Sequence, residues 1–343
     1  MNAMQLIQRA PIRPGHDPLL AVELPTPEIG ADEVLLAVHA CAVCHTELDQ
    51  IEGRVATPLP RVLGHQAVGR VIACGERVAT GLKGQRVGVG WIASACGACK
   101  WCARGEENLC PSFQATGREI DGGYAERMAV AAGFVHPIPD GLPDSAAAPL
   151  LCAGAIGLRS LRLSGHGPGR ILGLTGFGAS NHLVLTLARI LAPDAPVLVW
   201  ARDPNQRAQA LELGAAWAGD TDAQPPEQPD AIIDTTPVWT PVLAALTHLA
   251  HGGRLVVNAI AKENVDRERL AGLDYPTQLW REKEIKSVAN VCRRDIREVL
   301  ALAAEHPQLR PEHTVVPLLE ANNALQRIRH GGVCGAIVLD CSC

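Results

Sequence analysis

The hydrophobic and polar positions divide the chain into two parts that meet near residue 151. In the first part the apolar runs are short and lie between glycines or polar turns. They cover residues 33–41 (EVLLAVHAC), 67–75 (AVGRVIACG) and 84–90 (GQRVGVG). Short β-rich runs bounded by turn signals predict strands. We therefore expect the first part to form a small, β-barrel-like domain.

The second part alternates apolar runs with helical patterns. The apolar runs cover residues 170–178, 195–203, 231–236 and 253–261, and helical stretches cover residues 179–192 and 204–215. This alternation is typical of βαβ units that build a doubly wound parallel sheet. The last fifty or so residues hold two further helical patterns and a closing strand at residues 335–341, which we expect to return to the first domain.

Length and composition narrow the class of protein. A chain of 343 residues is long enough for two domains with a large core, and with 47% hydrophobic but 3% aromatic residues that core must be mainly aliphatic. A net charge of −5 argues against a general nucleic-acid binder. No apolar run approaches the length of a membrane span, and the N-terminus lacks a signal-peptide pattern. Twelve cysteines in such a chain indicate a reducing cytoplasm.

Four cysteines share one short loop, CGACKWCARGEENLC. They are Cys96, Cys99, Cys102 and Cys110. This spacing predicts a closed tetrahedral zinc site, which stabilises a loop and performs no chemistry. A pair of disulfides and an iron–sulfur cluster are the alternatives, both weaker.

Three further residues with metal-binding chemistry lie far apart in the sequence. Cys44 stands in CAVCHTEL, where a strand gives way to a helix; His65 stands in GHQ; and Cys152 stands in APLLCAG. Taken singly, each is more often a buried thiol or a core histidine. Together they could form a three-ligand zinc site that leaves a fourth position for water or substrate, as catalytic zinc requires.

A glycine-rich turn, GFGASN, follows an apolar run and opens a helical pattern. Glycines there let backbone N–H groups approach a pyrophosphate at the helix N-terminus. Asn181 stands where the third glycine is usual, which weakens the match. We expect this turn to bind a dinucleotide through Gly176, Gly178, Ala179, Ser180 and Asn181.

Taken in order, these motifs resemble the zinc-dependent alcohol dehydrogenases of the medium-chain dehydrogenase/reductase superfamily. The resemblance rests on CHTEL, GHQAVGRV, the four-cysteine loop, APLLCAG and GFGASNH, and it covers nearly the whole chain. It implies a GroES-like catalytic domain at residues 1–150 and 293–343, and a Rossmann domain at residues 151–292. It also implies two zinc ions per chain: a catalytic ion held by Cys44, His65 and Cys152, and a structural ion held by the four-cysteine loop.

The resemblance further implies hydride transfer between an alcohol, or the matching aldehyde or ketone, and a nicotinamide cofactor. Thr46 would accept the alcohol proton. Two positions depart from the family pattern: Gln66 replaces a glutamate, and Asp49 replaces a histidine that passes protons to solvent in relatives. The proton relay is therefore assigned to Asp49, His45 or water, without a choice among them.

The end of the second apolar run of the Rossmann domain bears on cofactor choice. Relatives specific for NAD place an acidic residue where Ala201 stands, and Arg202 could instead pair with a 2′-phosphate. This favours NADP(H) over NAD(H). In the alternative reading Arg202 is an ordinary surface charge and Asp203 holds the ribose. Thr235, in AIIDTT, is also expected to contact the cofactor.

The expected partners are a small alcohol or aldehyde and further copies of the same chain, as a dimer or tetramer. A zinc-dependent polyol or sugar dehydrogenase is one alternative function. A zinc-free quinone or enone reductase would not need Cys44, His65 and Cys152 together, so this set counts against it. The alternative from another class is a non-catalytic, zinc-stabilised nucleotide-binding protein.

Overall fold

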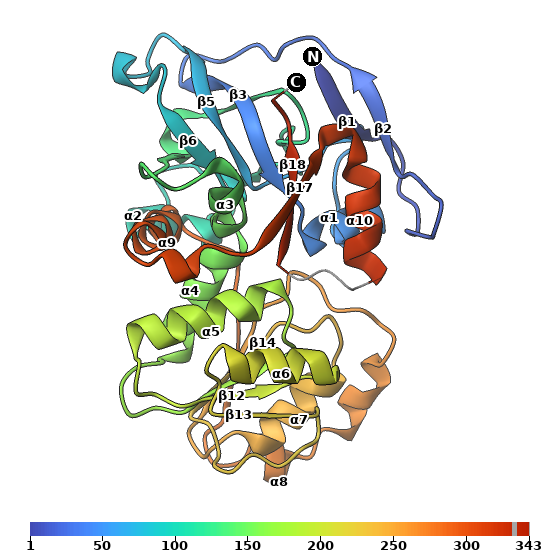
Figure 1. The fold of residues 1–343 in the computed structure, drawn as a ribbon, viewed down its shortest axis with the longest axis vertical. Coiled ribbons are helices and arrows are strands. Elements are labelled where there is room, and N and C mark those ends of the chain that lie inside the picture. Colours follow the sequence, from blue (N-terminus) through green and yellow to red (C-terminus); the bar gives the residue numbers. More distant parts are fainter. Residues whose placement is uncertain (331–334, 343) are drawn as a thin grey trace. The chain divides into compact units, whose positions relative to one another are not determined.

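The structure, a computed structural model, describes residues 1–330 and 335–342, apart from the side chain of Ala179. The chain divides into two compact units (Figure 1). The first unit combines Met1–Ala155 with Asn290–Cys343, and the second is Ile156–Ala289. The expected fold class, a β-rich domain plus a doubly wound parallel sheet, is confirmed.

The first unit is built around β3, which lies inside its main sheet. In this sheet the strand order is β10-β6-β5-β3-β18-β17, and β9 also pairs with β3. The C-terminal strand β18 pairs with β3 in antiparallel fashion, so the end of the chain completes the sheet begun near the N-terminus. The strands are β1 (Asn2–Leu6), β2 (Leu19–Glu23), β3 (Glu33–Ala42), β4 (Arg61–Val62), β5 (Ala67–Cys74), β6 (Arg86–Val89), β7 (Ile92–Ser94), β8 (Gln114–Ala115), β9 (Arg127–Ala131), β10 (Val135–Pro137), β17 (His313–Pro317) and β18 (Ala336–Asp340).

Short helices connect these strands and carry several candidate site residues. The α-helices are α1 (His45–Ile51), α2 (Lys100–Ala103), α3 (Asp144–Ala147), α9 (Arg293–Glu305) and α10 (Ala321–His330), and α4 (Ala153–Ser164) crosses the boundary of the two units. The 3₁₀ helices are η1 (Thr80–Leu82), η2 (Glu107–Leu109), η3 (Ala132–Phe134), η4 (Ala148–Leu151), η6 (Pro307–Leu309) and η7 (Leu318–Glu320).

The second unit is a parallel sheet with strand order β13-β12-β11-β14-β15-β16. The strands are β11 (Leu172–Thr175), β12 (Val197–Trp200), β13 (Trp217–Gly219), β14 (Ala231–Asp234), β15 (Arg254–Val257) and β16 (Glu284–Ser287), and the helices are α5 (Ala179–Leu191), α6 (Pro204–Glu212), α7 (Thr240–His248), η5 (Arg267–Gly272) and α8 (Tyr275–Gln278). The chain order reverses between β11 and β14, and ligands of such sheets bind at this switch point, beyond the carboxyl ends of the strands.

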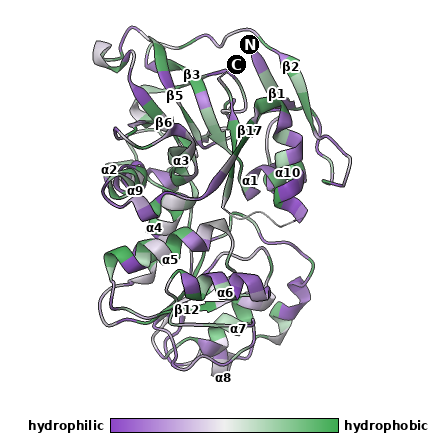
Figure 2. Cartoon of the chain, viewed as in Figure 1, coloured by the Kyte–Doolittle hydropathy of each residue, from purple (hydrophilic) through white to green (hydrophobic). Residues whose placement is uncertain are grey.

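Hydropathy follows this architecture. Every residue of β11, β12 and β14 is buried, as expected for strands covered on both faces. Hydrophilic residues run along much of α6 and α10 (Figure 2). In the described part of the chain no single helix is long and apolar enough to cross a membrane, although the bent pair of residues 144–151 and α4 passes by length and composition.

Candidate metal centres and cofactor site

Cys44, His65 and Cys152 come from three separate places in the first unit and meet in one group. Cys44 is the residue before α1, His65 follows β4, and Cys152 is the residue after η4. Their ligand atoms all lie within 4.8 Å of one another. Two sulfur atoms and one imidazole nitrogen in this arrangement match the ligand chemistry of a three-residue zinc site.

The two ring nitrogens of His65 have different surroundings: one is bonded to a carboxylate, and the other is buried without a partner among the described residues. Its Nδ1 lies 2.6 Å from Oε1 of Glu47, and the His65 and Glu47 side chains are 1% and 0% exposed. Its Nε2 is buried and, among the described residues, has no hydrogen-bond partner. A buried polar atom without a partner is costly, so a metal ligand at Nε2 fits the histidine as it stands.

The ionisable groups of this site shift one another strongly. The hydrogen bond with Cys152 lowers the pKa of the Cys44 thiol well below its usual value, against the cost of burial. The same bond, with burial, raises the pKa of Cys152 well above its usual value. Burial opposes protonation of His65, yet the charges of Glu47 and Cys44 raise its pKa to about 10. The negative charges of Glu47 and Cys44 therefore make this site favourable for a cation.

Glu47 is a site residue that sequence reasoning missed. Its Oε2 accepts the backbone N–H of Cys44 at 2.7 Å, so one carboxylate fixes both Cys44 and His65. This is half of a capping box at the start of α1. The acidic residue three positions after Cys44 was the available signal.

The proposed relay residues differ in their surroundings. Thr46 is 9% exposed and its hydroxyl lies 3.6 Å from Sγ of Cys44. Asp49 is buried, and its Oδ1 accepts from Nε of Arg54 at 2.6 Å. His45 is exposed. Gln66 points its amide at the carbonyl of Ala42, 3.4 Å away, and so acts on the backbone next to the site.

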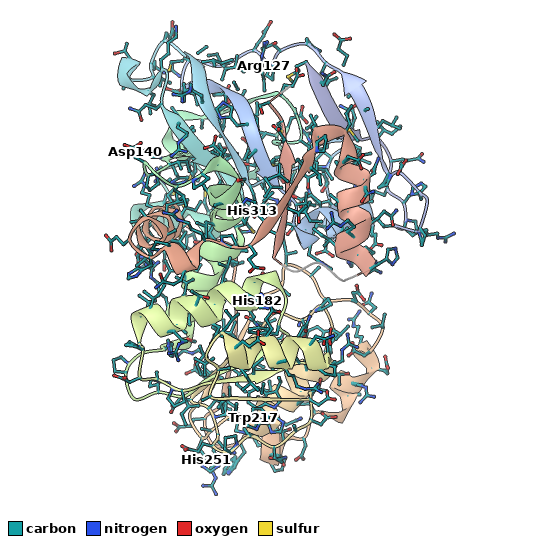
Figure 3. All side chains as sticks on the ribbon, viewed as in Figure 1. Arg127, Asp140, His182, Trp217, His251 and His313 are labelled. Atoms are coloured by element: carbon teal, nitrogen blue, oxygen red, sulfur yellow. The ribbon has the colours of Figure 1, made fainter. Side chains whose placement is uncertain are left out.

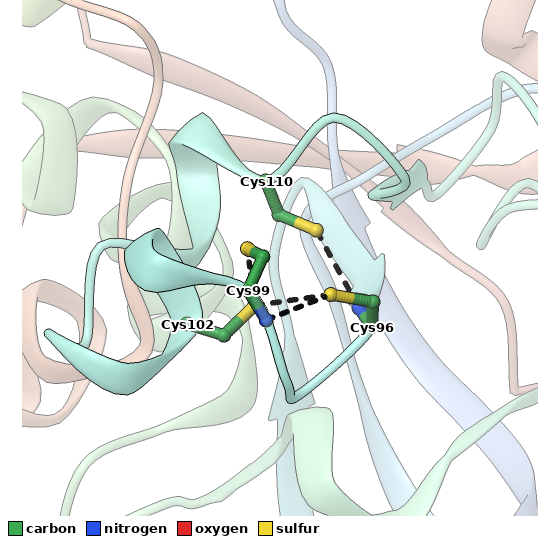
Figure 4. Close-up of side chains that lie close together, drawn as sticks. All are labelled: Cys96, Cys99, Cys102 and Cys110. Atoms are coloured by element: carbon green, nitrogen blue, oxygen red, sulfur yellow. Dashed lines mark hydrogen bonds between the residues drawn. The ribbon is translucent and has the colours of Figure 1, made fainter.

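The four-cysteine loop gathers its sulfur atoms into a second group (Figure 4). Cys102 Sγ lies 3.6 Å from that of Cys99 and 3.9 Å from that of Cys96. Four sulfurs placed 2.3 Å from a central zinc ion would lie about 3.8 Å apart, whereas a disulfide needs about 2.0 Å. Gly97 turns the loop with a φ of +72°, and the N–H of Cys99 reaches Cys96 Sγ at 3.4 Å. The geometry fits a closed tetrahedral metal site.

The glycine turn lies in the second unit, at the end of β11. Gly176 has a φ of +75°, and a Cβ there would meet Thr236 at 2.9 Å, so glycine is required. Gly178 precedes α5, whose first turn holds Ser180, and the side chain of Ala179 lies outside what the structure describes. Phe177 packs against His182, labelled in Figure 3, with ring centroids 4.3 Å apart.

Asn181, at the third-glycine position, folds back onto the turn. Its Nδ2 donates to the carbonyls of Thr175, at 3.1 Å, and Gly176, at 2.6 Å. Thr235 meets the same point, since its backbone N–H donates to the Thr175 carbonyl at 3.1 Å. Asn181, which weakens the match to the sequence motif, therefore fastens the glycine turn in the structure.

Ala201 and Arg202 follow β12, next to the glycine turn. The N–H of Gly176 donates to the carbonyl of Trp200 at 2.9 Å. Ala201 is 3% exposed, whereas Arg202 is exposed. Asp203 caps α6 by accepting the N–H of Asn205 at 2.8 Å, so its carboxylate already has a structural partner.

Comparisons with known proteins agree with this geometry. Residues 30–140 match the family described as the alcohol dehydrogenase GroES-like domain. The chain is 41% identical to "Probable alcohol dehydrogenase AdhA" of Mycobacterium tuberculosis, over 99% of this chain and 97% of that protein. It is 32% identical to an alcohol dehydrogenase of Geobacillus stearothermophilus, over 94% and 96%. A solved cinnamyl alcohol dehydrogenase from Sorghum bicolor is similar with a TM-score of 0.85 and 27% identity, over 100% of this chain and 98% of that one. The chain belongs to the zinc-dependent alcohol dehydrogenase family of the medium-chain dehydrogenase/reductase superfamily.

Proposed function

We propose that this protein is a zinc-dependent oxidoreductase that transfers hydride between a primary or secondary alcohol and a nicotinamide dinucleotide. One observation carries the proposal: Cys44, His65 and Cys152 converge within 4.8 Å. The partnerless Nε2 of His65 in that group supports a metal there. Family membership supports the reaction class.

The residues of the site divide the work. Cys44, His65 and Cys152 would hold zinc, which, when bound, lowers the pKa of an alcohol toward neutrality and polarises a carbonyl. Two thiolates and a neutral imidazole would balance the charge of the ion. Glu47 keeps His65 oriented through Nδ1. Thr46 takes the alcohol proton at its hydroxyl oxygen and gives its own hydroxyl proton to the relay, for which Asp49, His45 and water are the candidates.

The test combines metal counting with activity. We expect two zinc ions per chain in the wild type and one in Cys44→Ser, which should also lose alcohol oxidation. Cys74→Ser is the matched control, because Cys74 lies at the end of β5 outside both cysteine groups. Activity that survives loss of the ion from the Cys44 site would contradict the proposal.

We propose NADP(H) as the preferred cofactor. Support comes from Ala201, which is buried and has no carboxylate to bind a ribose, and from the exposed Arg202 beside it. Arg202→Ala should raise KM for NADPH about tenfold, the loss expected for one charge-assisted bond, and leave KM for NADH unchanged. Arg267→Ala, an exposed arginine of the same unit, is the control. A higher kcat/KM with NADH than with NADPH would show the preference to be wrong.

We also propose that the chain is a homo-oligomer, a dimer or a tetramer, in a reducing cytoplasm. The edge strand β16 is exposed along its whole length, and Ile285 is 49% exposed. Such an edge invites pairing with another strand. The cysteines of residues 1–330 and 335–342 are free thiols, as a reducing compartment requires. Sedimentation equilibrium should give more than one chain per particle.

A further inference from the structure

A buried ion pair lies at the carboxyl edge of the parallel sheet. Nζ of Lys262 is 2.5 Å from Oδ2 of Asp234, and the two side chains are 8% and 0% exposed. Asp234 ends β14, whereas Lys262 lies in the chain that follows β15. Neither residue belongs to the glycine turn itself, although Asp234 directly precedes Thr235.

All three donors of the Lys262 ammonium group bond to the segment of residues 234–238. Besides Asp234, its ammonium group donates to the carbonyls of Thr236, at 2.6 Å, and Val238, at 3.2 Å. These two residues belong to the β14 loop, which we define as residues 235–239. Lys262 is thereby saturated and holds this loop in place rather than reaching for a ligand.

The segment that carries Lys262 is tied to the same loop at two other points. We define the β15 loop as residues 258–266. The N–H of Glu263 donates to the carbonyl of Pro237 at 2.7 Å. Asp266 accepts from the N–H of Trp239 at 3.0 Å and from that of Thr240 at 2.7 Å. Hydrogen bonds therefore join the β14 and β15 loops to each other, and the ion pair joins the β15 loop to the end of β14.

This structure is joined directly to the glycine turn. Oδ1 of Asp234 accepts from the hydroxyl of Thr175 at 2.7 Å, and Thr175 is the last residue before Gly176. Asp234 and Thr175 end the two strands between which the chain order reverses. A dinucleotide bound at this switch point is anionic, so an unneutralised carboxylate at Asp234 would repel it.

We propose that Lys262 is a positioning residue for the dinucleotide: it cancels the charge of Asp234 at the switch point and fixes the β14 and β15 loops beside the glycine turn. The inference rests on the proposed function, since it assumes that this turn binds the cofactor. Buried ion pairs are often no more stabilising than apolar replacements, so a stability role alone is a weak account of this pair.

The experiment measures the dissociation constants of NADH and NADPH for the purified full-length chain by tryptophan fluorescence, together with KM and kcat. Lys262→Met should weaken dinucleotide binding by about tenfold, within the usual range of coupling between linked sites. Its kcat at saturating cofactor should change far less than KM. Lys262→Arg, which keeps the charge, should restore most of the affinity.

The double variant Asp234→Asn with Lys262→Met distinguishes two causes of weaker binding: the unpaired charge of Asp234, and the loss of the bonds that Lys262 makes to the β14 loop. It also gives a result if Lys262→Met alone does not fold. It leaves no unpaired charge, so it should bind dinucleotide more tightly than Lys262→Met, or at a measurable affinity where that variant is unfolded. Lys283→Met is the matched control, because Lys283 donates to two carbonyls of the same unit, of Leu246 and Thr277. It should bind dinucleotide as the wild type does.

Two results overturn the inference while leaving the proposed function intact. One is a folded Lys262→Met that binds dinucleotide within about twofold of the wild type, a change too small for coupled sites. The other is a double variant that binds no better than Lys262→Met, or that folds without binding. Failure of the wild type to bind either dinucleotide would instead overturn the proposed function and this inference with it.

Discussion

Asn181 changes the meaning of the glycine motif at the scale of one residue. By the sequence pattern, a side chain at the third-glycine position weakens the match to a dinucleotide-binding motif. In the structure its amide makes two hydrogen bonds to the backbone of the turn, and the residue is 0% exposed. The residue types of the motif predict the turn. They do not show that the Asn181 side chain points back and bonds to the turn's own carbonyls.

Asn181→Gly should therefore weaken the protein although it restores the usual motif. Loss of two hydrogen bonds should lower the free energy of unfolding of the second unit by about 1–3 kcal/mol. The freed turn should also bind dinucleotide less tightly. Urea unfolding and fluorescence titration measure the two effects.

Asn323→Gly, an exposed position in α10, serves as the control for the dinucleotide titration. Asn181→Asp tests the role of the donor group, because a carboxylate would face the Thr175 and Gly176 carbonyls and repel them. Unchanged dinucleotide affinity in both Asn181 variants would show that the turn holds its shape without the amide.

The three candidate zinc ligands show a second limit of sequence reasoning at this scale. Each precedes or follows a different element, so the residue types suggest a shared site and the family resemblance alone gave the set as an expectation. Local spacing holds no information about contacts across more than a hundred residues. The position of Glu47 three residues after Cys44 is a local signal for its bond to the Cys44 backbone. Its contact with His65 instead depends on how α1 packs against the residues after β4.

At the scale of elements, the four-cysteine loop is fastened to the first turn of α9. Glu107, in η2, accepts from Nε of Arg293 at 2.7 Å and from its backbone N–H at 3.1 Å. Sγ of Cys292 lies 2.9 Å from Oδ1 of Asn108. The loop therefore holds the point where the chain re-enters the first unit.

Cys99→Ser should release this contact while it spares the hydride step. With three sulfurs left, the loop should lose its zinc, so metal counting should give about one ion per chain, as a broken closed site requires. Hydrogen exchange should then rise at residues 96–110 and at the first turn of α9. The catalytic constant at saturating substrate should stay close to that of the wild type.

The Cys74→Ser variant again provides the control, because it removes a thiol outside both groups. Loss of turnover in Cys99→Ser, with unfolding stability and assembly unchanged, would mean that the loop takes part in the chemistry.

Strands show which elements a sequence can reveal. The strands β11, β12 and β14 were predicted because burial on both faces makes them continuous apolar runs. Strand β16, with sequence EIKS and every residue exposed, was not predicted. An edge strand takes its shape from its neighbour β15 rather than from its own pattern.

At the scale of the whole molecule, stability should depend on pH through a buried histidine. His136, in β10, is 1% exposed. Burial, together with the charges of Arg297 and Arg293, lowers its pKa to about 3, and Glu107 opposes this in part. In the unfolded chain the pKa should be near the ordinary value of about 6.5.

The sign follows from proton binding. Between about pH 3 and pH 6.5 the unfolded state holds a proton on His136 that the folded state does not. The stabilisation is therefore complete above pH 6.5 and is lost as the pH falls toward 3. Between pH 7 and pH 5 this one residue should remove about 2 kcal/mol from the free energy of unfolding.

His136→Gln removes the titration, so its loss of stability between pH 7 and pH 5 should be about 2 kcal/mol smaller than that of the wild type. Urea unfolding at a series of pH values, followed by a probe in the first unit, measures the difference. His330→Gln, which replaces an exposed histidine of the same unit, is the control substitution. Parallel curves for the wild type and His136→Gln would mean that His136 takes up its proton in the folded state, which would require the first unit to open around β10 before it unfolds.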